Sequence, residues 1–243
     1  MSLPPGWRIA RVGATRSTNA DLMAEAERGA AEGTALLADL QLAGRGREGR
    51  VWQSPAGNLH LSVILRPDCP ARDAGQVGLV AAVAIAGLLG RLGLRARLKW
   101  PNDVLVDGAK IAGVLVEAAL AGDRVAWAVV GIGLNVLCHP DDAGYPATSL
   151  AAHQISPPTA AALAPELLSA LAASLADWRA YGFARIRAAW LSYGPAPGEA
   201  ARVSIGAAQL TGAFRDLDPD GALVLEVLPG QHRRITAGEL AAP

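Results

Sequence analysis

The sequence predicts an α/β fold with a mixed sheet, followed by a small antiparallel β domain. Two observations support this. Strand-like and helical segments alternate up to about residue 193, which is typical of α/β domains. Residues 198–243 instead contain short apolar runs separated by Gly, Pro and Asp, the pattern of a small barrel. We therefore predict two domains, 1–193 and 198–243, which meet near the Gly/Pro-rich stretch 194–200.

The expected elements follow from hydrophobic periodicity and from Gly and Pro breakers. Strands are expected at 7–13, 34–41, 58–67 and 96–100, and within 103–136 with turns at Asp107-Gly108 and Gly122-Asp123. Helices are expected at 17–31, 75–92, 159–181 and 183–192. For the first helix, Thr18 is the expected N-cap, with Asp21 three residues later as in a capping box.

Composition excludes several classes of protein. The chain has 243 residues, 51% of them hydrophobic and 18% charged, so it can bury a core and is not disordered. Its net charge is zero, with 22 basic and 22 acidic residues, which argues against a DNA-binding or membrane-binding protein. Two cysteines, Cys69 and Cys138, make no disulfide framework, the N-terminus has no signal-peptide pattern, and the apolar run 77–90 is too short to span a bilayer. We expect a cytoplasmic protein.

Lysine and asparagine are scarce in this chain. Arginine occurs 20 times but lysine only at Lys99 and Lys110, and asparagine only at Asn19, Asn58, Asn102 and Asn135. An ammonium is a compact charge and a guanidinium a wide planar fork, so the rare lysines mark positions where arginine cannot substitute; the alternative is chance survival. All six lie in the motifs below and none in the helices at 75–92 or 159–192, which supports one shared site.

The first motif is the Gly/Arg loop, "QLAGRGREGRVWQSPAGN" (residues 41–58). Glycine lets backbone N–H groups wrap an anion, and arginine binds phosphate or carboxylate, often through two hydrogen bonds. The loop matches neither the P-loop nor the dinucleotide fingerprint. The alternative is a solvated basic loop, but Trp52 and the apolar flanks favour a loop that closes over an anionic ligand.

The second motif is "KWPNDVLVDGAKIAGVLVE" (99–117), which holds both lysines. Lys110 precedes an apolar strand, so its ammonium is expected to face a pocket, where it could neutralise a phosphate or carboxylate in a transition state. Asp103 could orient a lysine, accept a proton or help to hold a metal ion. The alternative is a hairpin with surface charges.

Two weaker motifs are "VVGIGLNV" (129–136) and "STN" (17–19). Gly131 and Gly133 within a strand indicate close approach by a ligand or another backbone, or else a bulge or tight packing. Helix capping explains Thr18 without any function, whereas Ser17 and Asn19 could point a hydroxyl and an amide at a polar ligand. The four histidines lack metal-ligand spacing, and no nucleophile elbow or zinc-protease motif occurs, so hydrolase and zinc chemistry are disfavoured.

Taken together, the sequence resembles the biotin protein ligases. The resemblance rests on "STN" (17–19), "GRGREGRVWQSPAGNL" (44–59), "KWPNDVLV" (99–106), "KIAGVLVE" (110–117) and "GIGLN" (131–135), in that order. The C-terminal part ending in "ITAGEL" is similar to the SH3-like barrel of the family, so the resemblance covers almost the whole chain. It implies a biotinyl/lipoyl-ligase-like catalytic domain with that barrel attached.

The resemblance implies a two-step reaction with ATP and Mg²⁺. Biotin is activated as biotinyl-5′-AMP and then transferred to a lysine of a biotin carboxyl carrier protein, such as that of acetyl-CoA carboxylase. The Gly/Arg loop would close over the triphosphate and then shield the anhydride from water. The enzyme could be a monomer or a homodimer. Only 16 residues precede "STN", so we expect the form without an N-terminal DNA-binding domain.

The resemblance also implies roles for individual residues. The reaction residues would be Lys110, which stabilises charge between carboxylate and α-phosphate, together with Arg47 and Asp103. The residues expected around biotin are Ser17, Thr18, Asn19, Gln41, Gly44, Arg45, Gly46, Arg47, Lys110, Gly113, Gly131 and Gly133. Those expected around ATP are Arg47, Arg50, Trp52, Lys99, Asn102 and Asn135. No fixed protein metal site is expected, and Mg²⁺ would accompany ATP near Asp103.

One residue departs from the family pattern, and two other functions stay open. His60 stands where an aromatic residue such as tyrosine is expected, and it could alter a pocket wall or face solvent. A lipoate or octanoate ligase shares the expected fold, but its Arg/Gly stretch is spelled differently. A non-catalytic biotin sensor would be indicated by loss of the catalytic lysine, and Lys110 is present.

Overall fold

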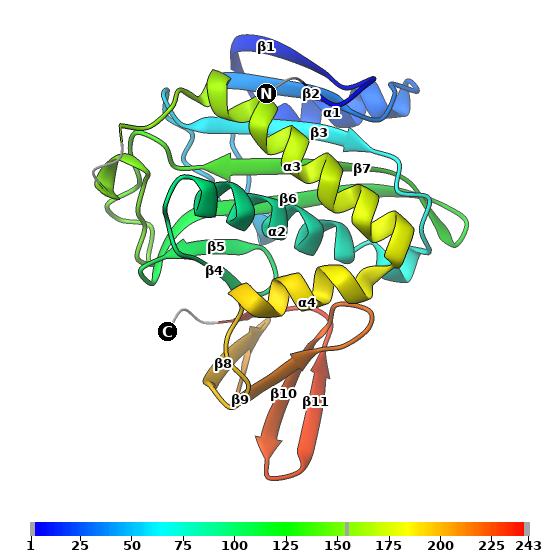
Figure 1. The fold of residues 1–243 in the computed structure, drawn as a ribbon, viewed down its shortest axis with the longest axis vertical. Helices are drawn as coiled ribbons and strands as arrows, with labels where there is room; N and C mark the ends of the chain where they lie inside the picture. The colour runs from blue at the N-terminus through cyan, green and yellow to red at the C-terminus, as the bar shows by residue number, and fades with distance from the viewer. Residues whose placement is uncertain (1–2, 154–155, 241–243) are drawn as a thin grey trace.

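The protein was analysed as a computed structural model that describes residues 3–153 and 156–240. The strands are β1 (Arg8–Thr15), β2 (Thr34–Gln41), β3 (Leu59–Leu65), β4 (Ala96–Lys99), β5 (Asp103–Val106), β6 (Ala109–Ala121), β7 (Arg124–Leu134), β8 (Ala200–Ile205), β9 (Ala208–Leu217), β10 (Leu223–Leu228), β11 (Gln231–Ile235) and β12 (Glu239–Leu240). The helices are α1 (Thr18–Glu27), α2 (Gln76–Arg91), α3 (Ala160–Tyr181) and α4 (Phe183–Tyr193). Figure 1 shows a broad sheet crossed by helices and a smaller sheet beneath it, which confirms the predicted fold class.

The main sheet has seven strands in the order β1-β2-β3-β7-β6-β5-β4. Only β1 and β2 pair in parallel, so the sheet is mixed, as predicted. Two of its hairpins have the two-residue turns that the sequence predicts. Asp107 and Gly108 both have positive φ, at 50° and 78°, and Gly122 has φ of 63°, as such tight turns require.

The two faces of the main sheet differ in chemistry because side chains alternate along each strand. One face is apolar and packs against α2 and α3, which cross it in Figure 1. The other face packs against α1 through a small cluster that includes Leu22 and Trp127. On this second face β6 and β7 also carry glycines, because Gly113 lies beside Gly133 in the register of the two strands. Because glycine has no side chain, these positions leave space for other groups on the α1 face of the main sheet.

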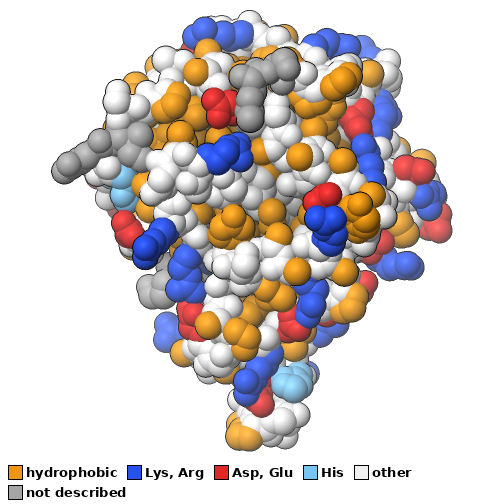
Figure 2. All heavy atoms as spheres, in the orientation of Figure 1, with side chains coloured by type: hydrophobic (Ala, Val, Ile, Leu, Met, Phe, Trp, Pro, Cys, Tyr) orange, Lys and Arg blue, Asp and Glu red, His pale blue; other side chains and the backbone are white. Residues whose placement is uncertain are grey.

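Helix α2 is the most buried of the helices. Twelve of its 16 residues are buried, as predicted for the run 77–90. Two segments, 71–91 and 160–181, are long and apolar enough to span a membrane by length and composition, and 67% of the first is buried inside the fold. In Figure 2, acidic and basic side chains are interspersed over this side of the molecule, in line with the zero net charge.

The predicted N-cap of the first helix is wrong by one residue. Ser17 is the N-cap: its backbone is extended, with φ of −161°, and its hydroxyl accepts a hydrogen bond from Ala20 N at 3.4 Å. Thr18 is the first helical residue, and its hydroxyl instead bonds to Gln41 and Ser62. The helix also ends at Glu27, four residues before the predicted end.

The second sheet is antiparallel, in the order β11-β10-β9-β8-β12. It is joined to the main sheet by specific hydrogen bonds at Trp100, which follows β4. The indole N–H of Trp100 donates to Gly221 O at 3.1 Å, and Leu240 N donates to Trp100 O at 3.2 Å. Leu240 in β12 is thereby held beside Trp100, next to β4. The division at residues 193 and 198 stays a prediction.

Candidate functional site

A cavity of about 330 Å³ lies on the α1 face of the main sheet, beneath the Gly/Arg loop. All but two of the residues predicted for biotin, ATP or the reaction line it. They are Ser17, Thr18, Asn19, Gln41, Arg45, Gly46, Arg47, Arg50, Trp52, Asn102, Asp103, Lys110, Gly113, Gly131, Gly133 and Asn135. The exceptions are Gly44 and Lys99. A loop, a helix start and four strands, β2, β5, β6 and β7, thus converge on one space although they are far apart in sequence.

The strand glycines create room for side chains of this chain. A Cβ at Gly131 would overlap the amide of Asn19, and one at Gly133 would overlap the indole of Trp52. The close approach predicted for these glycines is therefore made by two side chains that line the cavity. Gly44 acts in the same way inside the loop, where a Cβ would overlap the carbonyl of Trp52.

One end of the cavity contains alternating positive and negative groups. Lys110 Nζ lies 2.6 Å from Asp103 Oδ1, and Lys99 Nζ lies 2.8 Å from Asp103 Oδ2. Lys99 also reaches Glu239 at 3.1 Å, and Arg50 reaches the same carboxylate at 2.6 Å. We call Arg50, Lys99, Asp103, Lys110 and Glu239 the charged cluster. Asp103 is 3% exposed, and its register opposite Lys99 and Gly113 fixes its place.

Burial and pairing shift two pKa values in the charged cluster. Burial of Glu239 opposes its ionisation, but the hydrogen bond from Arg50 and the charge of Lys99 outweigh that effect and lower its pKa from 4.5 to about 2. Burial likewise opposes the charged form of Lys99, yet the neighbouring Asp103 and Glu239 raise its pKa. Both groups are therefore charged at neutral pH.

The ammonium of Lys110 lies between two aromatic rings. It is 5.4 Å from the ring centre of Trp52 and 5.1 Å from that of Tyr145, within the range of cation–π attraction. Tyr145 belongs to a segment that pairs with the start of β6. Lys110 N donates to Pro146 O at 2.8 Å, and Thr148 N donates to Lys110 O at 2.9 Å. Trp52 was among the predicted residues, but Tyr145 was not, because its segment carries no recognisable motif.

The opposite end of the cavity is formed mainly by neutral polar groups. Thr18 donates to the side-chain oxygen of Gln41 from both its N–H, at 2.9 Å, and its hydroxyl, at 3.0 Å. Asn19 is 4% exposed, and its Oδ1 accepts a hydrogen bond from Ser62 at 2.6 Å. This end offers fixed amide and hydroxyl groups, which suit a neutral polar ligand group.

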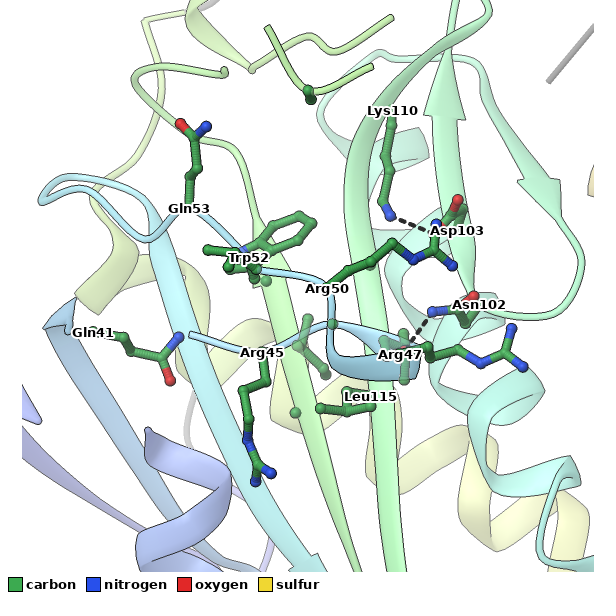
Figure 3. Close-up of a pocket in the computed structure, with 18 of the residues that line it drawn as sticks. Gln41, Arg45, Arg47, Arg50, Trp52, Gln53, Asn102, Asp103, Lys110 and Leu115 are labelled. Carbon is green, nitrogen blue, oxygen red and sulfur yellow. Dashed lines mark hydrogen bonds and ion pairs between the residues drawn. The ribbon is translucent and has the colours of Figure 1, made fainter. Parts of the chain in front are cut away.

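The three arginines of the Gly/Arg loop each bind a protein acceptor. Arg47 donates to Gly238 O at 3.0 Å, and Arg50 bonds to Glu239 within the charged cluster. Arg45 instead bonds to Glu117, at 3.1 Å. Figure 3 shows Arg50 turned toward Asp103 and Arg45 turned away from it. Glu117 and Glu239 lie within the quoted strings "KIAGVLVE" and "ITAGEL", but neither was predicted as a site residue.

The remaining scarce residues have structural contacts. Asn102 donates to Val114 O at 2.8 Å, and Asn135 donates to Thr148 O at 2.9 Å, so each ties a loop to the cavity wall. Asn58 lies outside the lining and accepts from three successive backbone N–H groups, the first that of Val136 at 2.9 Å. His60 is also outside the lining; it is 1% exposed, so it does not face solvent.

The cavity suits a ligand with a neutral polar end and an anionic end. Asp103 does not fit a metal ligand, because each of its oxygens already contacts an ammonium. Within residues 3–153 and 156–240, no group of three or more His, Cys, Asp or Glu side chains could hold a metal ion.

Comparison with known proteins agrees with this geometry. Residues 13–135 match the biotin/lipoate A/B protein ligase family, and residues 198–240 match the biotin protein ligase C-terminal domain. The biotin–[acetyl-CoA-carboxylase] ligase of Mycobacterium tuberculosis is 37% identical over 97% of this chain and 89% of its own length. The bifunctional ligase/repressor BirA of Bacillus subtilis is 46% identical over 48% of this chain. The matched part covers 37% of the length of that relative.

A solved structure has the same overall fold. The biotin protein ligase from Aquifex aeolicus in complex with biotin and ATP superposes with a TM-score of 0.81 at 28% identity. The match covers 96% of this chain and 97% of that one. The similarity therefore includes the main sheet and the small C-terminal sheet.

Proposed function

The chain belongs to the biotin/lipoate A/B protein ligase family, and we propose that it is a biotin protein ligase acting in the cytoplasm. The observation that carries the proposal is the single cavity that joins a neutral polar end to the charged cluster. Biotin has both kinds of group, a neutral ureido ring and a carboxylate. ATP supplies the second anion that so many cationic side chains can accommodate.

The proposed reaction has two steps. A carboxylate oxygen of biotin attacks the α-phosphorus of ATP, and the bond to the pyrophosphate oxygen breaks, which leaves biotinyl-5′-AMP. The deprotonated amine of a carrier lysine then attacks the acyl carbon, and AMP departs. We propose a biotin carboxyl carrier protein as the acceptor, since relatives bear the name biotin–[acetyl-CoA-carboxylase] ligase.

We assign biotin to the polar end of the cavity. The ureido ring would meet Thr18 and Gln41, and the apolar ring would extend toward Gly113, which lies beneath the side chains of Lys110 and Trp52. Support comes from their position in the lining and from the burial of Thr18. The other residues assigned to this end are Ser17, Asn19, Gly44, Arg45, Gly46, Gly131 and Gly133.

We assign the reacting groups to the other end. Lys110 would stabilise the negative charge that develops between carboxylate and α-phosphate, because a fixed charge in a water-poor site costs little reorganisation. Asp103 would hold that ammonium in place. Arg47, Arg50, Lys99, Asn102 and Asn135 would surround the nucleotide, with Trp52 beside Lys110.

Mg²⁺ is proposed to enter with the triphosphate. Asp103 is already neutralised by two ammonium groups, so a divalent ion would depend on phosphate oxygens for most of its ligands. When bound, Mg²⁺ would neutralise phosphate charge.

The test is exchange of labelled pyrophosphate into ATP, with biotin, lipoate or octanoate as the acid. We expect exchange with biotin alone, because activation is reversible and requires the acid that fits. Exchange with lipoate or octanoate would move the function to the sister ligases. Binding of biotin without any exchange would indicate a sensor and contradict the proposal.

A further inference from the structure

Glu117 is a carboxylate outside the cavity lining that binds two lining residues, Asn19 and Arg45, and the proposed reaction does not use it. It lies on β6, two residues beyond Leu115 and four beyond Gly113, so its side chain projects from the same face of the sheet as theirs. Its side chain is 23% exposed, which leaves it at the edge of the pocket. A carboxylate that is largely removed from water needs hydrogen-bond or ion-pair partners.

Its two oxygens bind two elements that the chain brings from far away. Glu117 Oε2 accepts from the Asn19 amide at 2.9 Å, at the start of α1. Both oxygens accept from Arg45, at 3.1 and 3.2 Å, in the Gly/Arg loop. Through one side chain, Glu117 therefore links helix α1, strand β6 of the main sheet and the Gly/Arg loop.

The Asn19 amide has one orientation available. Its nitrogen donates to Glu117 and to Leu115 O, and its oxygen accepts from Ser62. Gly131 leaves the space that the amide occupies, since a Cβ there would overlap it. Every polar atom of this amide is satisfied, so Glu117 contributes to a fixed pocket wall.

The hydrogen bonds continue from Asn19 to the far end of the Gly/Arg loop. The Ser62 and Thr18 hydroxyls lie 2.7 Å apart, and the backbone N–H of Thr18 donates to Gln41 at 2.9 Å. Gln41 then donates to Ser54 at 3.0 Å, and Ser54 donates to Trp52 O at 3.1 Å. One connected network thus holds both sides of the loop, and Glu117 is its acidic end.

Arg45 is the loop arginine best placed to hold the Gly/Arg loop closed, and we call its ion pair with Glu117 the pin. Arg47 and Arg50 contact Gly238 and Glu239, next to the charged cluster, whereas Arg45 points away from Asp103 and Lys110 (Figure 3). We propose that Glu117 is a positioning residue that holds the Gly/Arg loop closed through Arg45 and keeps Asn19 oriented in the pocket wall. It would act on the reaction without touching the reacting atoms.

The closed loop has a consequence that rests on the proposed function. If the cavity holds an acyl-adenylate, the pin limits access of water to the anhydride. Loss of the pin should then raise the release of adenylate into buffer. The pin itself, however, concerns the free protein and can be tested without any substrate.

Trypsin measures opening of the loop directly, because its cleavage sites include Arg47 and Arg50. In native protein, Glu117→Gln should speed cleavage after these residues by about two- to fivefold, the size expected of a partly exposed ion pair. The melting temperature should stay near that of the wild type. The matched control is Asp39→Asn, since Asp39 is also a strand carboxylate bound to an exposed arginine, Arg11, at 2.8 Å.

Arg45→Gln tests the same contact from the other side. We expect it to speed cleavage after Arg47 and Arg50 as much as Glu117→Gln does, and the double variant should be no faster than Arg45→Gln alone. Unchanged cleavage in Glu117→Gln would overturn the proposal. So would additive effects, or faster cleavage along the whole chain with a lower melting temperature. Pyrophosphate exchange by the wild type reports separately on the proposed function.

Discussion

The carboxylate of Asp103 is almost fully buried, yet both of its oxygens contact ammonium groups, those of Lys99 and Lys110. Removing charged groups from water is costly, and such a cluster persists only when each charge has partners. The charged cluster has an excess of one positive charge, because three cations face two carboxylates. An incoming phosphate can therefore enter without displacing every internal pair.

The first prediction concerns Lys110. Lys110→Met should lower the rate of pyrophosphate exchange by about 10²- to 10³-fold, because a preorganised charge is lost where negative charge develops. The fold should survive, since Lys99 still neutralises Asp103 at 2.8 Å. Thermal unfolding followed by circular dichroism checks this. Arg95→Met, which removes an exposed cation elsewhere, is the control; near-normal exchange in Lys110→Met would refute the assignment.

Residues inside a motif could be predicted from sequence, and residues outside one could not. Lys110 and Asp103 lie in one short string whose strand and turn signals bring them together. Tyr145 and Glu239 reach the same cavity only because backbone pairing and the second sheet deliver them. The scarce lysines and asparagines were predicted to share one site, but Asn58 does not line the cavity. It caps a turn outside it, since an asparagine can be retained for backbone geometry alone.

Among the elements, the Gly/Arg loop contains a sharp reversal of the backbone. Glu48 and Gly49 both have positive φ, at 56° and 74°, so the chain reverses sharply between Arg47 and Arg50. This reversal directs both guanidinium groups toward the end of the chain, at Gly238 and Glu239. The loop is therefore held at this end by the second sheet and at the other end by Arg45.

The loop prediction concerns Arg47. Arg47→Gly should still form the adenylate but retain it less well, because the contact to Gly238 is lost and a glycine adds freedom to the open loop. Release of biotinyl-5′-AMP into buffer, measured without carrier protein, should rise several-fold. Arg72→Gly, at an exposed position outside the loop, is the control. Unchanged retention of biotinyl-5′-AMP would contradict the proposal that the Gly/Arg loop closes over the adenylate.

The ordered elements were largely predictable because periodicity and breakers agree. Strands β2 and β4 and the two tight hairpins have the expected places, with Pro101 ending β4. The N-cap was missed because Ser17 and Thr18 are both good capping residues, and only the extended backbone of Ser17 decides between them. The pairing of Lys110 with Ala147 could not be predicted from sequence, because apolar and polar residues do not alternate in the segments around either residue.

At the scale of the whole molecule, the second sheet completes the site. Glu239, at the start of β12, enters the cavity lining and contacts Arg50 and Lys99. Trp100 and Leu240 join the two sheets by a backbone hydrogen bond beside it. Docking of the small sheet is thus coupled to the charge state of one partly buried carboxylate, and this predicts how stability depends on pH.

Glu239 should stabilise the docked fold above its ordinary pKa and lose that effect in acid. Its pKa falls from 4.5 to about 2 in the folded protein, so the unfolded chain binds the proton first as pH drops. Its contribution is therefore complete above pH 4.5 and disappears between about 4.5 and 2. It should amount to at most about 2 kcal/mol, because the carboxylate is partly exposed and solvent screens it.

Glu239→Gln tests this, because glutamine keeps the shape and a hydrogen-bonding oxygen for Arg50 but has no charge to lose. Urea unfolding from pH 7 to pH 3 should give a smaller loss of unfolding free energy in this variant than in the wild type. Glu25→Gln, an exposed helical carboxylate paired with Arg28, should leave the wild-type slope almost unchanged. Equal slopes in the wild type and Glu239→Gln would mean that docking of the small sheet does not depend on this charge. The hydrogen bonds at Trp100 would then be sufficient to hold the two sheets together.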